Sequence, residues 1–354
     1  MNPRIEINYR KLVHNTEVLQ EKAKEHGIEL AAVTKCFCGI PEIAQGYVDG
    51  GVKYLADSRI SNIKKLQELP NPKILLRLPM LTEVHETVAF ADISLNSEIE
   101  TIRALNREAK ILGVNHRVIL MADLGDLREG VFEEEELILV AKEVEALSNI
   151  ILHGIGVNLT CYGGVIPSVK NLSKLEYLGN AIEKEIGRSL EIYSGGNSSS
   201  IYLLDEKSIP ERINHLRLGE AIVLGTESAY GKNIENTHQD IFQLVGEVIE
   251  LKEKPSMPIG EIGMDAFGNT PSFEDEGIRK RAILAVGRQD FGSYDIFPVK
   301  EGMKILGASS DHLILDVTDA KGDVAVGDEI RFNLRYGALL SLMTSEYITK
   351  KIIY

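Results

Sequence analysis

The feature that most constrains this chain is a regular alternation of short apolar segments with longer amphipathic ones. Eight short segments are rich in aliphatic and β-branched residues, which is typical of buried strands. They are residues 30–35, 54–57, 74–78, 93–96, 118–122, 151–157, 192–194 and 216–218. Between them, segments such as 97–113 and 169–187 carry apolar residues every three to four positions, which predicts helices. Eight strand-then-helix units predict an α/β fold of the (β/α)8 TIM-type barrel kind, with a doubly wound open sheet as the alternative.

The pattern changes after residue 234. Four later segments are strand-like and are separated by Gly-Asp turns; they are residues 241–250, 282–286, 313–317 and 329–334. A short strand-like run at residues 4–7 precedes the first helix. We therefore expect two domains, a barrel over residues 9–233 and a mostly β domain over residues 234–354 that also includes residues 1–8.

The bulk composition narrows the classes of partner. The 354 residues carry a net charge of −14 and no long basic run, so a nucleic-acid backbone or an anionic membrane would be repelled. No apolar run approaches the roughly 20 residues that span a bilayer, and the N-terminus lacks a signal-peptide pattern. Cys36, Cys38 and Cys161 form neither a disulfide framework nor a zinc set. We expect a cytoplasmic protein without a metal site that acts on a small molecule.

Barrels of this kind carry their active sites at the C-terminal ends of the strands. Lys35 ends the first apolar segment, where its amine could form a Schiff base with a carbonyl group. The alternative is a lysine that only extends into solvent. The glycine- and serine-rich loop 194–200 follows the seventh segment, and Arg217-Leu218-Gly219-Glu220 follows the eighth. Loops after strands seven and eight form the usual phosphate site of the barrel.

A fourth feature, Asp123-Leu124-Gly125-Asp126-Leu127-Arg128, follows the fifth segment. Together the four features resemble the fold-type III enzymes that depend on pyridoxal 5′-phosphate (PLP), and the alanine racemase family most clearly. The resemblance implies that Lys35 is the Schiff-base lysine and that Arg128 lies near the phenolic oxygen of the cofactor. It also implies a homodimer, in which each site is shared between the barrel of one subunit and the β domain of the other.

The same resemblance implies several cofactor contacts. Arg217 would face the pyridine nitrogen, and Asn158 stands where the family has a histidine near the ring. The residues that would hold the phosphate are Asn197, Ser198, Gly219, Glu220 and Tyr336. Because an arginine keeps its proton at any usable pH, Arg217 would leave the ring nitrogen unprotonated and weaken the electron sink. A short-lived carbanion of this kind favours racemisation over transamination.

Racemisation by two bases needs a second acid/base group opposite Lys35. The family places a tyrosine there, but this chain has Arg288, which is a poor base and a candidate ligand for the substrate carboxylate. Candidates for the second base are His312, Asp311 and Cys161, each with a purely structural alternative.

Residues 56–59, 156–163 and 307–312 are most similar to family members that act on ornithine. We therefore expect a racemase of a cationic amino acid, ornithine first and lysine second. Its side-chain ammonium would need a carboxylate, for which the candidates are Glu261, Asp265 and Asp290. The alternatives are an alanine racemase proper, a fold-type III amino-acid decarboxylase and a non-enzymatic PLP carrier.

Overall fold

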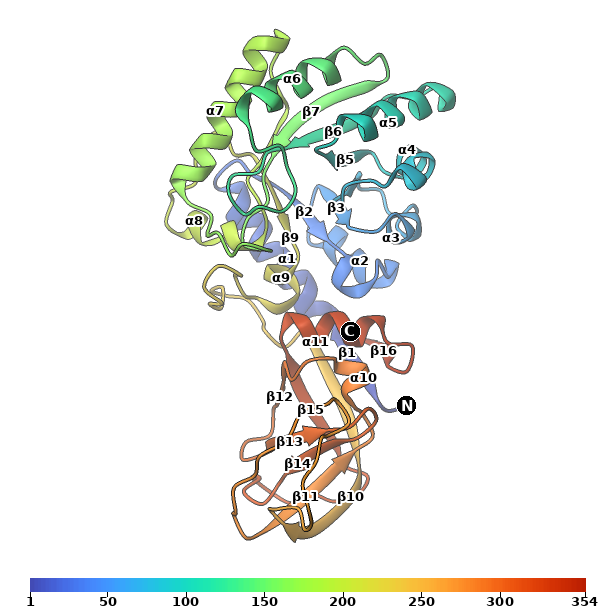
Figure 1. The fold of residues 1–354 in the computed structure, drawn as a ribbon, viewed down its shortest axis with the longest axis vertical. Coiled ribbons are helices and arrows are strands. Elements are labelled where there is room, and N and C mark those ends of the chain that lie inside the picture. The colour runs from blue at the N-terminus through green and yellow to red at the C-terminus, as the bar shows by residue number, and fades with distance from the viewer. The chain divides into compact units, whose positions relative to one another are not determined.

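The computed structural model describes all 354 residues, which form two compact units. One unit comprises Arg10–His238, and the other comprises Met1–Tyr9 together with Gln239–Tyr354. The expected domains were residues 9–233 and residues 234–354 with 1–8. Figure 1 shows the order of the helices and strands in both units.

The first unit is a closed barrel of eight strands that pair in parallel and in chain order, so the predicted TIM-type fold is confirmed and the open sheet is wrong. Each predicted segment overlaps one strand. The strands are β2 (Glu29–Val33), β3 (Tyr54–Asp57), β4 (Lys73–Leu75), β5 (Ile93–Asn96), β6 (His116–Met121), β7 (Ile150–Gly156), β8 (Ile192–Ser194) and β9 (His215–Leu218). In a parallel barrel all C-terminal strand ends meet at one rim, where a site can form.

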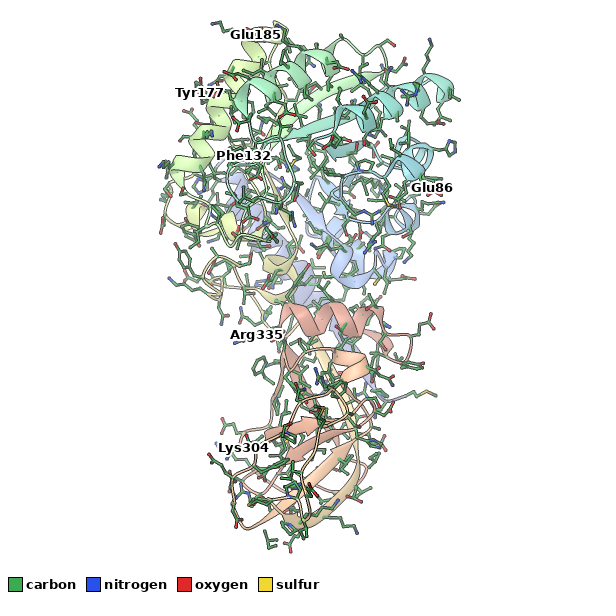
Figure 2. All side chains as sticks on the ribbon, viewed as in Figure 1. Glu86, Phe132, Tyr177, Glu185, Lys304 and Arg335 are labelled. Carbon is green, nitrogen blue, oxygen red and sulfur yellow. The ribbon has the colours of Figure 1, made fainter.

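One helix precedes the first barrel strand, and one further helix follows each of the eight strands. They are α1 (Tyr9–Lys24), α2 (Pro41–Asp49), α3 (Ile60–Lys65), α4 (Val84–Phe90), α5 (Ile99–Leu112), α6 (Glu134–Glu145), α7 (Val169–Ile186), α8 (Tyr202–Asp205) and α9 (Glu220–Leu224). Three short 3-10 turns complete the set: η1 (Lys35–Phe37), η2 (Leu81–Glu83) and η3 (Ser198–Ser200). Ion pairs link the outer sides of neighbouring helices, as in Lys64–Glu86 at 2.7 Å and Lys142–Glu185 at 2.8 Å. Figure 2 labels the two glutamates on the outside of the barrel unit.

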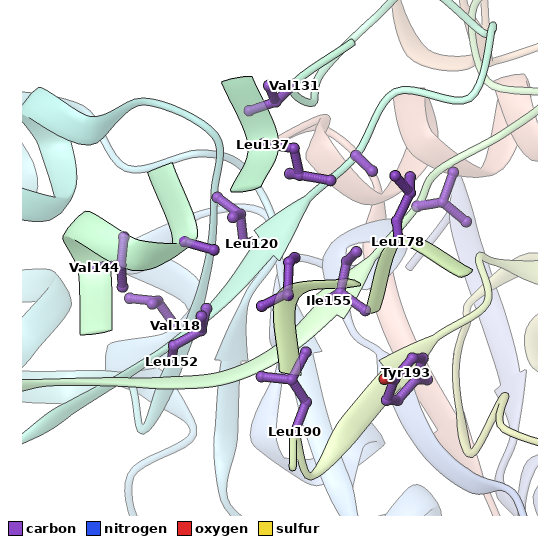
Figure 3. Packing of buried hydrophobic residues seen from close by; sticks show 14 of the residues in the cluster. Val118, Leu120, Val131, Leu137, Val144, Leu152, Ile155, Leu178, Leu190 and Tyr193 are labelled. Carbon is purple, nitrogen blue, oxygen red and sulfur yellow. The ribbon is translucent and has the colours of Figure 1, made fainter. Parts of the chain in front are cut away.

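The core between the helices and the barrel follows from the helical spacing. On α6, Leu137 and Val144 lie on one face and pack in the same cluster as Val118 and Leu120 of β6 (Figure 3). Each of these side chains is 1% exposed or less. Burying one such side chain stabilises the fold by roughly 1.5–3 kcal/mol, so this layer holds the barrel strands in register.

The second unit is mostly β, as expected, and its strands are paired in the order β12-β15-β10-β11-β14-β13. The first strand of the chain, β1 (Arg4–Asn8), pairs with β10 and β16. The other strands are β10 (Phe242–Pro255), β11 (Ile278–Leu284), β12 (Ile296–Pro298), β13 (Lys304–Ala308), β14 (Leu313–Asp316), β15 (Glu329–Leu334) and β16 (Thr349–Ile353). Two helices, α10 (Arg288–Phe291) and α11 (Tyr336–Thr344), complete the unit. No helix of the chain combines the length and the apolar character needed to cross a bilayer.

Candidate active site

Lys35 is exposed at the rim of the barrel, at the start of η1 and two residues after β2 ends. The residue before it is held by a buried carboxylate, because the Thr34 hydroxyl donates to Asp57 Oδ2 at 2.6 Å. Asp57 also accepts from the Arg59 amide at 2.9 Å and from Asn62 Nδ2 at 3.1 Å. Burial raises the pKa of the Asp57 carboxyl, and these hydrogen bonds oppose that rise. The neighbouring strand therefore fixes the backbone that carries Lys35, a role for Asp57 that we did not predict from the sequence.

The loops after β8 and β9 are tied to each other at the same rim. Ser198 Oγ accepts from the backbone amides of Gly219 at 3.3 Å and Ala221 at 3.1 Å. Asn197 caps η3 through its Oδ1, and its Nδ2 donates to Asn158 Oδ1 at 3.0 Å. The structure thus brings together the residues that we expected to hold a phosphate group from the barrel.

Arg217 is a buried cation without a carboxylate partner. Its side chain is 4% exposed; Nη1 donates to Ser194 Oγ and Nη2 donates to the Val157 carbonyl at 2.7 Å. Burial lowers the pKa of Arg217 to about 10. A guanidinium held only by neutral acceptors is costly to bury, and an anionic ligand would offset that cost.

Buried donors near Arg217 provide a direct test of whether PLP fits this site. Asn158 Nδ2 and Ser199 Oγ are buried without a hydrogen-bond partner in the loops after β7 and β8. Unpartnered buried polar groups are rare in folded proteins and call for a ligand or a water molecule. An amide donor, a hydroxyl donor and a buried cation suit an anionic, phosphorylated cofactor, so the residues fit PLP.

The loop after β6 carries a second buried carboxylate. Asp126 is fully buried and accepts from the backbone amides of Thr160, Tyr162 and Val165, all in the loop after β7. It therefore locks together two loops of the rim, which we did not predict. Arg128 lies on the same loop, is exposed, and pairs with its neighbour Glu129.

Glu220 is the first residue of α9, and its carboxyl group is partly buried. Because β2 and β9 are adjacent, with Ala32 opposite Leu218, the residues that follow the two strands lie close together. Burial, and then Glu227, raise the pKa of Glu220, while Lys35 lowers it. The Glu220 carboxyl group is therefore within electrostatic range of Lys35. From the sequence we had assigned Glu220 only to the cofactor.

The candidates in the second unit fall on four segments. Glu261 and Asp265 are exposed in the connection between β10 and β11, where Asp265 Oδ1 accepts from the amides of Phe267 and Asn269. These hydrogen bonds lower the pKa of Asp265. Tyr336 is the first residue of α11 and is partly buried.

Arg288, Asp311 and His312 come from two segments that lie side by side. The Arg288 amide donates to the Ser309 carbonyl at 2.9 Å, and Gln289 Nε2 donates to Asp311 Oδ1 at 2.6 Å. The Arg288 guanidinium stacks 3.9 Å from the centre of the Phe267 ring, which orients it by a cation–π contact. His312 is exposed.

Asp290 does not present an open carboxylate. Its side chain is 3% exposed; Oδ2 accepts from the Gly287 amide at 3.3 Å and Oδ1 accepts from Ser345 Oγ at 2.9 Å. These contacts make it a capping residue of α10 whose two oxygens already have partners within the unit, so we do not carry Asp290 into the proposed substrate site.

A (β/α)8 barrel with a lysine after its first strand and loops rich in hydrogen-bond donors after its last two is the arrangement expected of PLP-dependent barrel enzymes. The family model for the N-terminal domain of alanine racemase matches residues 7–227. The chain therefore belongs to the alanine racemase family, and its cofactor is PLP.

Individual relatives extend over the whole chain. Ornithine racemase of Acetoanaerobium sticklandii is 51% identical over 353 residues, with 100% of each chain covered. Lysine racemase of Thermotoga maritima is 41% identical over 350 residues, with 98% of each covered. Among solved structures, alanine racemase of Clostridium difficile 630 has a TM-score of 0.76 at 19% identity and covers 100% of this chain and 96% of its own. At that identity the structural likeness supports the fold alone.

Proposed function

We propose that this protein racemises a cationic amino acid, with ornithine as the first substrate and lysine as the second. The observation that carries the proposal is the 51% identity, over both full lengths, to the ornithine racemase of A. sticklandii. The lysine racemase relative supports the same substrate class. The partly buried Glu220 carboxyl near Lys35 adds a negative charge on the side of the barrel where the substrate would bind.

In the proposed mechanism, Lys35 carries the cofactor and exchanges the α-proton on one face of the substrate. When bound, PLP withdraws electrons from the α-carbon of the attached amino acid and so makes its proton acidic. Asn197, Ser198, Gly219 and the Glu220 amide would hold the phosphate from the barrel, with Tyr336 as a further contact. Arg217 would face the ring nitrogen and keep its own proton.

The second base is proposed among three groups that differ in their surroundings. Cys161 Sγ lies in the barrel unit and accepts from Asn197 Nδ2 at 3.3 Å. The two Asp311 oxygens accept from Gln289 and Ser310, whereas His312 is exposed. Each base exchanges the α-proton of one enantiomer, so loss of the second base should slow solvent exchange of the α-proton from only one of the two enantiomers. We would therefore measure the solvent deuterium uptake from L- and D-ornithine separately in Cys161→Ala, Asp311→Asn and His312→Gln; equal uptake from both enantiomers in all three would exclude all three candidates.

Substrate recognition would divide between two charges. Arg288, held by its aromatic neighbour Phe267, is the proposed ligand of the substrate carboxylate. For the distal ammonium we propose Glu220, Glu261 or Asp265. Neutral isosteres at these three positions should raise the KM for ornithine more than that for an uncharged amino acid, and unchanged ornithine turnover in the triple variant would contradict the proposal.

We further propose a cytoplasmic homodimer whose sites include residues of both subunits, with a partner copy contributing Arg288. The cytoplasm is supported by the three cysteines, none of which forms a disulfide. Mixing Lys35→Ala with Arg288→Ala should then restore part of the activity that each lacks, because one of the two sites in a mixed dimer is intact. Light scattering would measure the dimer, and no restored activity from a dimer that exchanges subunits would contradict a shared site.

The function itself is tested with a panel of amino acids in deuterated water. With ornithine we expect the circular dichroism of the substrate to disappear while deuterium is incorporated at the α-carbon. With lysine both changes should be slower, and neither substrate should release carbon dioxide. Carbon dioxide release would favour a decarboxylase, turnover of alanine alone would favour an alanine racemase, and no turnover of any amino acid by the holoprotein would favour a PLP carrier. Lys35→Ala should lose the yellow absorbance of the bound cofactor.

A further inference from the structure

Two buried serine–histidine pairs bridge neighbouring barrel strands, one between β8 and β9 and the other between β5 and β6, and only the first of them touches an arginine. Ser194 Oγ lies 2.7 Å from His215 Nδ1, and Ser94 Oγ lies 2.8 Å from His116 Nε2. All four residues are 2% exposed or less. Ser194 Oγ also accepts a hydrogen bond from Arg217 Nη1, whereas Ser94 Oγ accepts from the side-chain Nδ2 of Asn96. The mechanism proposed above uses Arg217 but neither Ser194 nor His215.

The direction of the hydrogen bonds follows from the donor inventory of the three groups. A guanidinium has donors only, so Arg217 must donate and Ser194 Oγ must accept. Ser194 Oγ has two lone pairs and could accept from both Arg217 and His215, but its single hydroxyl proton would then have no acceptor, because its remaining contact is His215 Nδ1. The proton therefore points toward Nδ1, which must be the unprotonated nitrogen of the ring. A neutral His215 then carries its proton on Nε2.

The surroundings of His215 agree with this neutral form. Burial, and then the charge of Arg217, lower the pKa of His215 to about 3. Its Nε2 has no protein partner, and the ring borders a cavity of about 160 Å³ lined also by Glu29, His153 and Glu191.

The strand geometry makes the chain of contacts continuous. His215 and Arg217 are two residues apart on β9, so their side chains project to the same face of the strand. Ser194 ends β8 and pairs in register with His215. We infer that His215 is a positioning residue: through Ser194 it orients the Arg217 guanidinium toward the cofactor ring. This inference rests on the proposed function only in the role that it gives Arg217.

A positioning role and a packing role predict opposite orders of two variants. His215→Asn keeps an acceptor oxygen near the position of Nδ1 but loses the ring. His215→Phe keeps a ring against Tyr54, whose centroid lies 5.5 Å away, but loses the acceptor. In His215→Phe the hydroxyl proton of Ser194 has no acceptor at the Nδ1 position, so it can rotate toward Arg217 and disturb the hydrogen bond that the guanidinium donates to Ser194 Oγ. We therefore expect His215→Phe to weaken PLP binding by about 10-fold or more, the loss expected for a hydrogen bond to a charged group.

The experiment measures PLP affinity of the apoprotein by absorbance titration, together with ¹⁵N NMR of histidine-labelled protein. We expect His215→Asn to bind PLP nearly as tightly as the parent protein. His215→Phe and Ser194→Ala should bind it about 10-fold more weakly. The control His116→Phe should lose stability but keep its affinity for PLP. The parent spectrum should show His215 protonated on Nε2 and not on Nδ1.

Either of two results would overturn the inference: a proton on Nδ1 of the parent, or binding by His215→Asn that is as weak as or weaker than by His215→Phe. The NMR measurement needs no variant to fold. An inactive parent protein that still shows these affinities and this tautomer would contradict the proposed function and leave the positioning role intact.

Discussion

Asp126 joins two loops at the rim of the barrel, and three backbone amides depend on its carboxylate. Oδ1 accepts from the amides of Thr160 at 2.9 Å and Val165 at 3.1 Å, while Oδ2 accepts from the Tyr162 amide at 3.0 Å. All three amides belong to the loop that begins near Asn158. Asp126→Ala would leave them without an acceptor and release that loop.

Each hydrogen bond to an ionised group contributes about 1.5–3 kcal/mol, so three give roughly 4.5–9 kcal/mol as an upper limit. Tyr162 is 73% exposed, and the released amides near it can bind water again. We therefore expect Asp126→Ala to lower the free energy of unfolding by about 3 kcal/mol. Asp126→Asn keeps one oxygen that can accept from Thr160 and Val165, so it should cost only about 1–1.5 kcal/mol.

The assay is urea unfolding of the apoprotein followed by circular dichroism, with PLP titration of the same samples. Glu136→Gln is the matched control for loss of one negative charge, because Glu136 is exposed and should change stability by less than about 0.5 kcal/mol. A loss below about 1 kcal/mol in Asp126→Ala, or equal losses for the alanine and asparagine variants, would refute the reasoning.

Three further predictions concern the barrel. Burial lowers the pKa of His116 to about 4, so between about pH 6.5 and 4 the unfolded chain binds a proton that the folded chain does not. The free energy of unfolding should therefore decrease as the pH is lowered through this range, by up to about 1.4 kcal/mol per pH unit. If the pH dependence of urea stability is the same in His116→Gln as in the parent, this prediction is wrong. A Cβ at Gly154 would lie 2.3 Å from the Ile192 carbonyl oxygen, so Gly154→Ala should lower stability by about 3 kcal/mol in thermal melts, whereas Gly263→Ala, with nothing within 4 Å, should not. Glu220→Gln should lower kcat/KM for ornithine about 10-fold relative to 2-aminopentanoic acid, as for a lost ion pair of about 1.4 kcal/mol; an unchanged ratio would place the substrate ammonium elsewhere.

Parts of the second unit show where sequence patterns stop being informative. Strand β12 has one buried residue and β13 has none, so neither has the alternation of buried and exposed residues that is typical of a strand. Helix α11 buries Ala338, Leu339, Leu342 and Met343 within nine residues, a span too short to distinguish a helix from a buried strand by periodicity.

The roles of individual carboxylates were the least predictable part of the site. Glu220 directly follows Gly219, and Asp290 comes three residues after Gly287. The sequence around the two carboxylates is similarly loop-like, but Asp290 is a buried cap and Glu220 lies near Lys35. Asp57 and Asp126 were not distinguished from turn residues, because their partners Thr34 and Thr160 lie 23 and 34 positions away.

The sequence by itself determined the barrel, the position of Lys35 at the end of its first strand, and the two loops expected to hold phosphate. Strand and helix periodicities are local properties, and strand order in a parallel barrel follows chain order, so these features can be read along the chain. Only the tertiary structure decided which polar groups are buried and what they bind. The contact of Arg217 with Ser194, and of Ser194 with His215, depends on the register of β8 against β9, and packing of the whole barrel sets that register.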